Sequence, residues 1–186
     1  TGTVRFDLET VPADEFALNL RIPGWARGTP IPGGLYHASK DTAVEDWTVS
    51  VNGEPLEQDR LWNGYARIDR DWDAGDTVEL ELPLSPQRVR SHPAVDATAN
   101  SVAFMRGPLV YCFESTDQPV DLESVAVPSQ PSTRVEHRES LLDGVSVIEV
   151  DAVTEAGGRA TLTAVPYYAW ANRAPGAMRV WLPDAQ

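Results

Sequence analysis

Apolar and polar residues alternate along most of this chain with a period of two, the spacing that turns one face of a strand toward a core and the other toward water. In residues 16–22, Leu18, Leu20 and Ile22 fall on one face, whereas Asn19 and Arg21 fall on the other. An Asn-Gly pair directly after residue 51 adds the strongest short hairpin signal. The same alternation predicts further strands over residues 3–8, 47–51, 65–69 and 77–82, and a short edge strand over 87–92.

Residues 101–114 differ from these segments, because two continuous apolar runs flank an Arg-Gly-Pro break. The runs, 102–105 and 109–113, are short and rich in β-branched and aromatic residues, which is typical of a strand buried on both faces. Pro108 cannot donate to a ladder and Gly107 tolerates unusual backbone angles, so the break predicts a bulge or a sharp corner. We expect the rest of the chain to be organised around this stretch.

After residue 114 the composition shifts toward Asp, Ser, Gln and Pro as far as residue 131, which is the best candidate for a boundary between groups of strands. Strand-like segments follow at residues 133–136, 145–150, 160–165 and 178–182, and nowhere do apolar residues keep helical spacing for three turns. We therefore expect an all-β chain with very little helix, built as an antiparallel β-sandwich. Residues 1–115 would form the main sandwich, and residues 116–186 would complete it or form a smaller second one.

The net charge of the chain limits the classes of partner that it is expected to bind. Its 15 Lys and Arg residues stand against 28 Asp and Glu residues, which gives a net charge of −13. Such a surface repels nucleic acid and anionic membranes, so neither is expected as a partner. The charge fits an extracellular or salt-adapted protein and equally a genome that favours Arg, Ala, Asp and Gly, so the localisation stays open. The chain starts within a strand pattern, without a methionine or a signal peptide, which predicts a segment of a longer protein.

The residues that commonly act in catalysis or metal binding are scattered along the sequence. His37, His92 and His137 lie in separate segments and Cys112 has no neighbouring Cys or His, so no metal or other cofactor is expected in this chain. Cys112 lies in an apolar strand, where we expect a buried, inert thiol rather than a nucleophile. The acids between residues 69 and 76 follow a turn, where Asp commonly bonds to the backbone, so they are not read as a glycosidase pair. No catalytic residue is assigned.

The aromatic residues offer two candidate surfaces. Trp25, Trp62 and Trp72 lie in or beside predicted loops, where their rings would stack on a sugar; the alternative is that they fill the space between two sheets. Residues 166–173 are too rich in aromatic side chains for an ordinary loop. We expect this segment to dock on the domain's own sheet or on a neighbouring domain, through Tyr167, Tyr168, Trp170 and Arg173.

Four segments together resemble the C-terminal portion of glycoside hydrolase family 127, the β-L-arabinofuranosidase family. They are Leu-Asn-Leu-Arg-Ile-Pro-Gly-Trp at 18–25, Val-Ser-Val-Asn-Gly-Glu at 49–54 followed by residues 64–70, the stretch 102–114, and residues 165–182. The most specific parts are Arg-Gly-Pro-Leu-Val-Tyr at 106–111 and the aromatic segment 166–173. The resemblance covers nearly the whole chain and is weakest over residues 27–46.

This resemblance implies a retaining glycosidase whose chemistry lies in an (α/α)₆ barrel outside this chain. The family's cysteine nucleophile, and the zinc bound by a glutamate and cysteines, belong to that barrel. Cys112 lies outside the family's metal-binding cysteine motif, so no catalytic role carries over to it. The chain would then be a non-catalytic β-sandwich region that packs on the barrel of the same polypeptide and supports it. The alternative is a carbohydrate-binding module that holds an oligosaccharide with its loop tryptophans.

Overall fold

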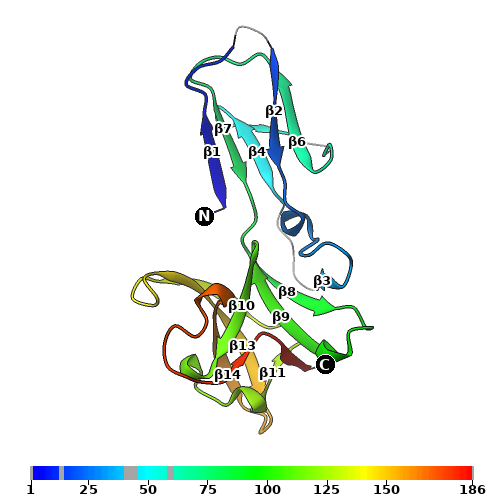
Figure 1. Cartoon of the computed structure of the whole chain (residues 1–186), viewed down its shortest axis with the longest axis vertical. Helices are drawn as coiled ribbons and strands as arrows, with labels where there is room; N and C mark the ends of the chain where they lie inside the picture. The colour runs from blue at the N-terminus through cyan, green and yellow to red at the C-terminus, as the bar shows by residue number, and fades with distance from the viewer. Residues whose placement is uncertain (1, 13–14, 40–45, 58–60, 186) are drawn as a thin grey trace. The chain divides into compact units, whose positions relative to one another are not determined.

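The computed structural model describes residues 2–12, 15–39, 46–57 and 61–185, and strands make up most of their regular structure (Figure 1). The prediction of an all-β chain is therefore confirmed. Helical structure in the described residues consists of short 3-10 turns, and none is long or apolar enough to cross a membrane. These turns are η1 Gly24–Arg27, η2 Asp96–Thr98, η3 Ser115–Asp117, η4 Leu122–Ser124 and η5 Tyr167–Ala169.

The contacts divide the chain into two units. Unit 1 comprises Thr1–Pro30 and Val44–Ser85, and unit 2 comprises Ile31–Ala43 and Pro86–Gln186. Apart from Ile31–Ala43, which belongs to unit 2, the division thus falls between residues 85 and 86, whereas the sequence analysis placed the end of the main sandwich at residue 115. The reason is that the apolar stretch 101–114 pairs with strands that follow it in the sequence, so it belongs with them.

Unit 1 contains two antiparallel sheets. The larger has the order β1-β7-β4-β5, and the smaller pairs β2 with β6. Asn52, with φ 53°, and Gly53, with φ 82°, connect β4 to β5, which confirms the hairpin expected from the Asn-Gly pair. The strands are β1 Thr3–Asp7, β2 Phe16–Arg21, β4 Thr48–Val51, β5 Glu54–Leu56, β6 Tyr65–Arg70 and β7 Thr77–Glu81.

Both sheets of unit 1 contribute to one hydrophobic core. Leu20 and Ile68 enter it from β2 and β6, and Val49 and Val78 enter it from β4 and β7, each with at most 4% of its surface exposed. The intervening residues of β2 and β6 face outward, as the period of two predicts. This core leaves the outer face of the β2–β6 sheet exposed.

Six strands of unit 2 close into a barrel. Strand β9 pairs with both β10 and β16, and the ring runs onward through β14, β13 and β11. A closed barrel therefore replaces the expected sandwich in this unit, and its β11–β16 pairing is parallel. The strands of unit 2 are β3 Tyr36–Ala38, β8 Pro86–Ser91, β9 Ser101–Arg106, β10 Leu109–Glu114, β11 Val125–Pro128, β12 Thr133–Arg138, β13 Val145–Thr154, β14 Arg159–Pro166, β15 Met178–Arg179 and β16 Leu182–Ala185.

The apolar stretch that the sequence singled out forms the β9–β10 hairpin of this barrel (Figure 1). Phe104 and Phe113 are at most 1% exposed and meet edge to face inside it, with ring centroids 6.1 Å apart. Arg106 lies opposite Leu109, so the break is a two-residue turn rather than a bulge. Gly107 has φ 58° and occupies the first central position, where a hairpin turn requires glycine.

A buried ionic group connects the last strand of the barrel to β8. The side chain of Asp184 in β16 is 1% exposed and pairs with Arg88 and Arg90. Arg88 also donates to the carbonyl of Ser129 in the loop after β11. Because β16 lies between β9 and β11, this group holds the strand that closes the ring.

Candidate functional site

The two most specific segments of the sequence, residues 106–111 and 166–173, meet at one place in unit 2. Strands β10 and β14 pair so that Tyr111 lies opposite Pro166. Proline has no N–H with which to extend the ladder, so the strand ends there and η5 follows directly. The aromatic segment is therefore held beside β10.

Arg173 attaches the end of this segment to the barrel. Its Nη2 atom lies 2.5 Å from Oε2 of Glu114 and 2.6 Å from Oδ2 of Asp117, and its Nη1 atom pairs with the other oxygen of Asp117. The second oxygen of Glu114, Oε1, accepts a hydrogen bond of 3.2 Å from the backbone N–H of Ala171. Ala171 has φ 61°, a strained value for a residue with a Cβ, so this contact fixes an unfavourable turn.

Glu114 and Asp117 are the residues of this site that the sequence analysis missed. The side chain of Glu114 is 5% exposed, and the two carboxylates raise the pKa of Arg173 above its usual value, with the hydrogen bond to Asp117 as the largest cause. A fully buried carboxylate is rare unless it is paired. The available signal was the acid that ends the apolar run 109–113, directly before the polar segment.

The large aromatic side chains of the segment are exposed to solvent, whereas Arg173 is directed into the barrel domain. Tyr167, Tyr168 and Trp170 are 45%, 66% and 42% exposed, whereas Ala169 between them is 5% exposed. Tyr167 and Trp170 stack with ring centroids 5.9 Å apart. We call the exposed side chains of Tyr167, Tyr168 and Trp170 the aromatic platform. Of the four predicted docking residues, these three are free to meet another surface, and the fourth is engaged within its own domain.

Tyr111 and Arg106 lie near the platform. The Tyr111 hydroxyl donates to the carbonyl of Ser146 at 3.0 Å, and burial raises its pKa, while the neighbouring Arg106 lowers it and Tyr168 raises it slightly. The Nε atom of Arg106 is buried without a hydrogen bond, and Arg106 forms no ion pair with any of the described residues. A half-buried arginine without an acid partner therefore lies beside exposed aromatic rings.

The three predicted sugar-binding tryptophans do not form one surface. Trp72 is 7% exposed, stacks on Phe16 and donates from Nε1 to the Phe16 carbonyl at 3.0 Å, so it fills the core of unit 1 as the alternative held. Trp25 is half-buried against the same core. Trp62 is the exception, because 63% of its surface is exposed.

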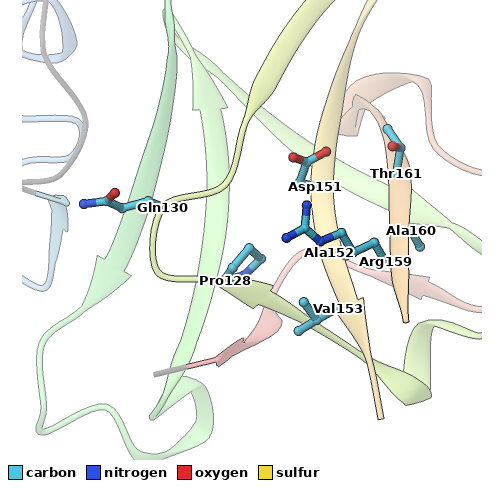
Figure 2. Close-up of a pocket in the computed structure, with 8 residues that line it drawn as sticks. All are labelled: Pro128, Gln130, Asp151, Ala152, Val153, Arg159, Ala160 and Thr161. Carbon is cyan, nitrogen blue, oxygen red and sulfur yellow. The ribbon is translucent and has the colours of Figure 1, made fainter. Parts of the chain in front are cut away.

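Unit 2 also contains a cavity of about 440 Å³ on the outside of β13 and β14. Figure 2 shows Asp151 and Arg159 projecting from these strands on the side of Pro128, the last residue of β11, whereas Gln130 points away from them. Asp151 is the one acid among the eight lining residues, so the cavity offers no pair of carboxylates for glycosidic hydrolysis. The lining is Pro128, Gln130, Asp151, Ala152, Val153, Arg159, Ala160 and Thr161.

Cys112 has the properties of a structural thiol. It is fully buried, and burial followed by the charge of Glu114 raises its pKa to about 11, so it is protonated at neutral pH. A nucleophilic or metal-binding cysteine requires the thiolate. In the part of the chain that the structure describes, no group of His, Cys, Asp and Glu side chains is arranged to hold a metal ion.

Comparison with known families assigns both units. The model of the glycoside hydrolase family 127 C-terminal domain matches residues 86–183, and that of the β-L-arabinofuranosidase GH127 middle domain matches residues 1–84. The chain belongs to glycoside hydrolase family 127. The family resemblance inferred from the four segments is therefore confirmed. The boundary between the two GH127 domains lies where unit 1 ends at Ser85, although Ile31–Ala43 of the middle-domain match belongs to unit 2.

Individual proteins similar to this chain are consistent with the family assignment. The non-reducing end β-L-arabinofuranosidase of Bifidobacterium longum subsp. longum is 37% identical over an alignment that covers 87% of this chain and 25% of that protein. A solved structure of a GH127 β-arabinofuranosidase matches 99% of this chain with 38% identity and a TM-score of 0.88. A GH127 β-L-arabinofuranosidase from Geobacillus stearothermophilus T6 matches 99% of it with 34% identity and a TM-score of 0.82. The chain spans 25–30% of the length of these relatives.

Proposed function

We propose that this chain is the supporting, non-catalytic part of a larger GH127 enzyme and that it packs on the catalytic domain of the same polypeptide. Two points support the proposal. The chain matches the middle and C-terminal domains of the family, and its relatives are three to four times as long. By the names of those relatives, the complete enzyme would release β-L-arabinofuranosyl residues.

The aromatic platform is the observation that carries this proposal. Large exposed aromatic side chains that gather on one surface commonly mark an interaction site. Here a buried ionic group holds the backbone beneath them, through Arg173 with Glu114 and Asp117. Such a support lowers the entropy that would be lost on binding, because the loop is already ordered. The platform is therefore suited to packing against a second domain.

Arg106 indicates the chemistry of the opposing surface. Six arginines of unit 2, at positions 88, 90, 134, 138, 173 and 179, form ion pairs with acids, whereas Arg106 and Arg159 form none with the described residues, and of these two only Arg106 lies near the platform. An Asp or Glu of the catalytic domain would satisfy this guanidinium at the edge of the platform. The contact would then combine an apolar centre with one charged hydrogen bond.

The catalytic steps are assigned to the other domain. The protonated thiol of Cys112 is a poor nucleophile, and the described residues offer no ligand group for zinc. If the complete enzyme uses zinc, its ligands would lie in the catalytic domain. The contribution of this chain would be to hold elements of that domain in place, which changes the rate through positioning rather than chemistry.

Co-expression tests the proposal directly. The catalytic domain and the 186-residue chain, produced as separate polypeptides in one cell, are expected to purify as a complex. Alanine substitution of Tyr167, Tyr168 and Trp170 together should abolish the complex while each part stays folded. Trp62→Ala provides the control, because it removes an even more exposed indole from unit 1 and should leave the complex intact. Two parts that never associate, or a complex that is indifferent to the triple substitution, would contradict the proposal.

A further inference from the structure

The outer face of the β2–β6 sheet carries a row of three exposed side chains. Trp62 and Tyr65 form a hydrogen-bonded antiparallel pair, since each backbone N–H donates to the other carbonyl at 2.9 Å. The side chains of such a pair leave the same face, with their Cα atoms about 5.5 Å apart. Tyr65 in turn lies opposite Arg21 of β2. We call Arg21, Tyr65 and Trp62 the aromatic row.

The backbone holds this row in a defined geometry. Asn63 and Gly64 connect the paired residues with φ 50° and 83°, which are the positive values of a tight hairpin turn. The guanidinium of Arg21 lies 5.3 Å from the Tyr65 ring centroid and donates to the carbonyl of Gly64 at 2.8 Å. A Cβ at Gly64 would lie 1.9 Å from Nη1 of Arg21, so glycine is required for this contact. The turn, the ring and the guanidinium thus fix one another.

We propose that the aromatic row is a binding site for a neutral oligosaccharide. A sugar ring presents C–H groups that pack on the negative face of an indole or phenol ring, and its hydroxyls accept hydrogen bonds from a guanidinium. Trp62 is 63% exposed and Tyr65 is 38% exposed, so both rings can be reached from solvent. The stacked Arg21 places its remaining N–H donors beside them.

The neighbouring side chains favour an uncharged, hydroxyl-rich ligand. Beyond the row, the outward positions of β2 and β6 carry Ala17, Asn19, Arg67 and Asp69, and the last two neutralise one another in an exposed ion pair of 2.9 Å. The electrostatic potential beside the row is therefore weak and would attract an anion only slightly. The centre of a protein interface is depleted of charged residues, whereas charges lie directly beside this row. Solvated polar groups next to aromatic rings suit a carbohydrate better than a protein partner.

This proposal is independent of the docking role, because the aromatic row belongs to unit 1 and the aromatic platform to unit 2. The test uses the 186-residue chain, titrated by calorimetry with arabino-, xylo- and cello-oligosaccharides, while the indole N–H signals are followed by NMR. We expect saturable binding of at least one series at millimolar or lower concentration. Trp62→Ala and Tyr65→Ala should each weaken it about tenfold or more, because each removes a stacking surface.

Two further variants distinguish the site from a general effect. Gly64→Ala should weaken binding by displacing Arg21, although both rings remain. Trp170→Ala should leave the affinity unchanged, because it removes an exposed indole from the other unit. Trp62→Ala must also keep the thermal midpoint of the unsubstituted chain. The proposal is overturned if no series binds, if binding survives Trp62→Ala, or if the row instead mediates self-association that this substitution abolishes.

Discussion

Arg173 is the residue on which the geometry of the aromatic platform depends most. It joins the loop to two carboxylates, and the side chain of one of them, Glu114, is 5% exposed. A buried ion pair of this kind adds little net stability compared with apolar packing, but the loss of one partner leaves a charge buried alone. The side chain thus specifies where the loop lies more than it stabilises the barrel.

Arg173→Ala is therefore expected to be strongly destabilising, by about 3 kcal/mol, because Glu114 and Asp117 would lose their counter-charge. Arg179→Ala removes a more exposed ion pair with Glu123 and should cost less than about 1 kcal/mol. Chemical denaturation of both variants provides the comparison. If both variants lose the same free energy of unfolding, removal of Arg173 does not leave a buried charge without a partner.

Because Cys112 is buried, the free energy of unfolding of the chain is expected to depend on pH. The pKa of the Cys112 thiol rises from the usual 9.0 to about 11 in the folded chain, mainly through burial. Between these values the unfolded chain loses a proton that the folded chain keeps, so the free energy of unfolding should fall as the pH rises through this range. Tyr111, whose pKa is also raised, acts in the same direction at higher pH.

The Cys112→Ala variant isolates the contribution of the thiol. Its free energy of unfolding should fall less steeply with pH above 9 than that of the unsubstituted chain, whatever the absolute stability of the variant. Denaturant titrations on both sides of this pH measure the two slopes. Identical slopes would mean that Cys112 ionises in the folded chain as readily as in the unfolded one.

At the scale of elements, the sequence predicted the strands better than their closure. The alternation in residues 16–22 and the Asn-Gly hairpin signal are local, and both were confirmed. Closure of the barrel depends on β16 pairing with β9 and β11, which are far from it in the sequence. The alternation of apolar and polar residues indicates which side chains are buried, but not which strands pair. A barrel and a sandwich therefore give the same sequence pattern.

The same limit applies to single side chains in the candidate sites. Trp62 and Trp72 both lie at strand ends, yet one is exposed and the other fills the core, because Trp72 reaches back to the carbonyl of Phe16. The aromatic segment was recognisable by composition. The inward direction of Arg173 was not, because its acid partners lie on and directly after another strand.

A substitution of Asp184 tests whether the ion pairs of β16 hold the barrel closed. Asp184→Asn removes the charge that Arg88 and Arg90 share, so unit 2 should lose about 3 kcal/mol of stability. Amide exchange should quicken in residues 182–185 and in β8, with no change in the strands of unit 1. Asp69→Asn, in an exposed ion pair with Arg67, should have an effect below about 1 kcal/mol. Unchanged exchange in β16 would exclude the closing role.

At the scale of the whole molecule, the two units carry different surfaces. Unit 1 presents the aromatic row on the outer face of a sheet, and unit 2 presents the aromatic platform near Arg106, which has no acid partner among the described residues. The relatives that the chain matches are much longer, and the chain corresponds to their middle and C-terminal domains. We therefore propose that the platform contacts the catalytic domain and that the row binds a sugar.

The measurement that tests the docking claim most directly is hydrogen–deuterium exchange of residues 166–173. It is made once on the 186-residue chain and once on the polypeptide that joins it to its catalytic domain. If the platform docks on the catalytic domain, we expect markedly slower exchange of this segment, and of the β9–β10 turn with Arg106, in the longer polypeptide, and no change at residues 62–65. Equal exchange of residues 166–173 in the two proteins would contradict this docking.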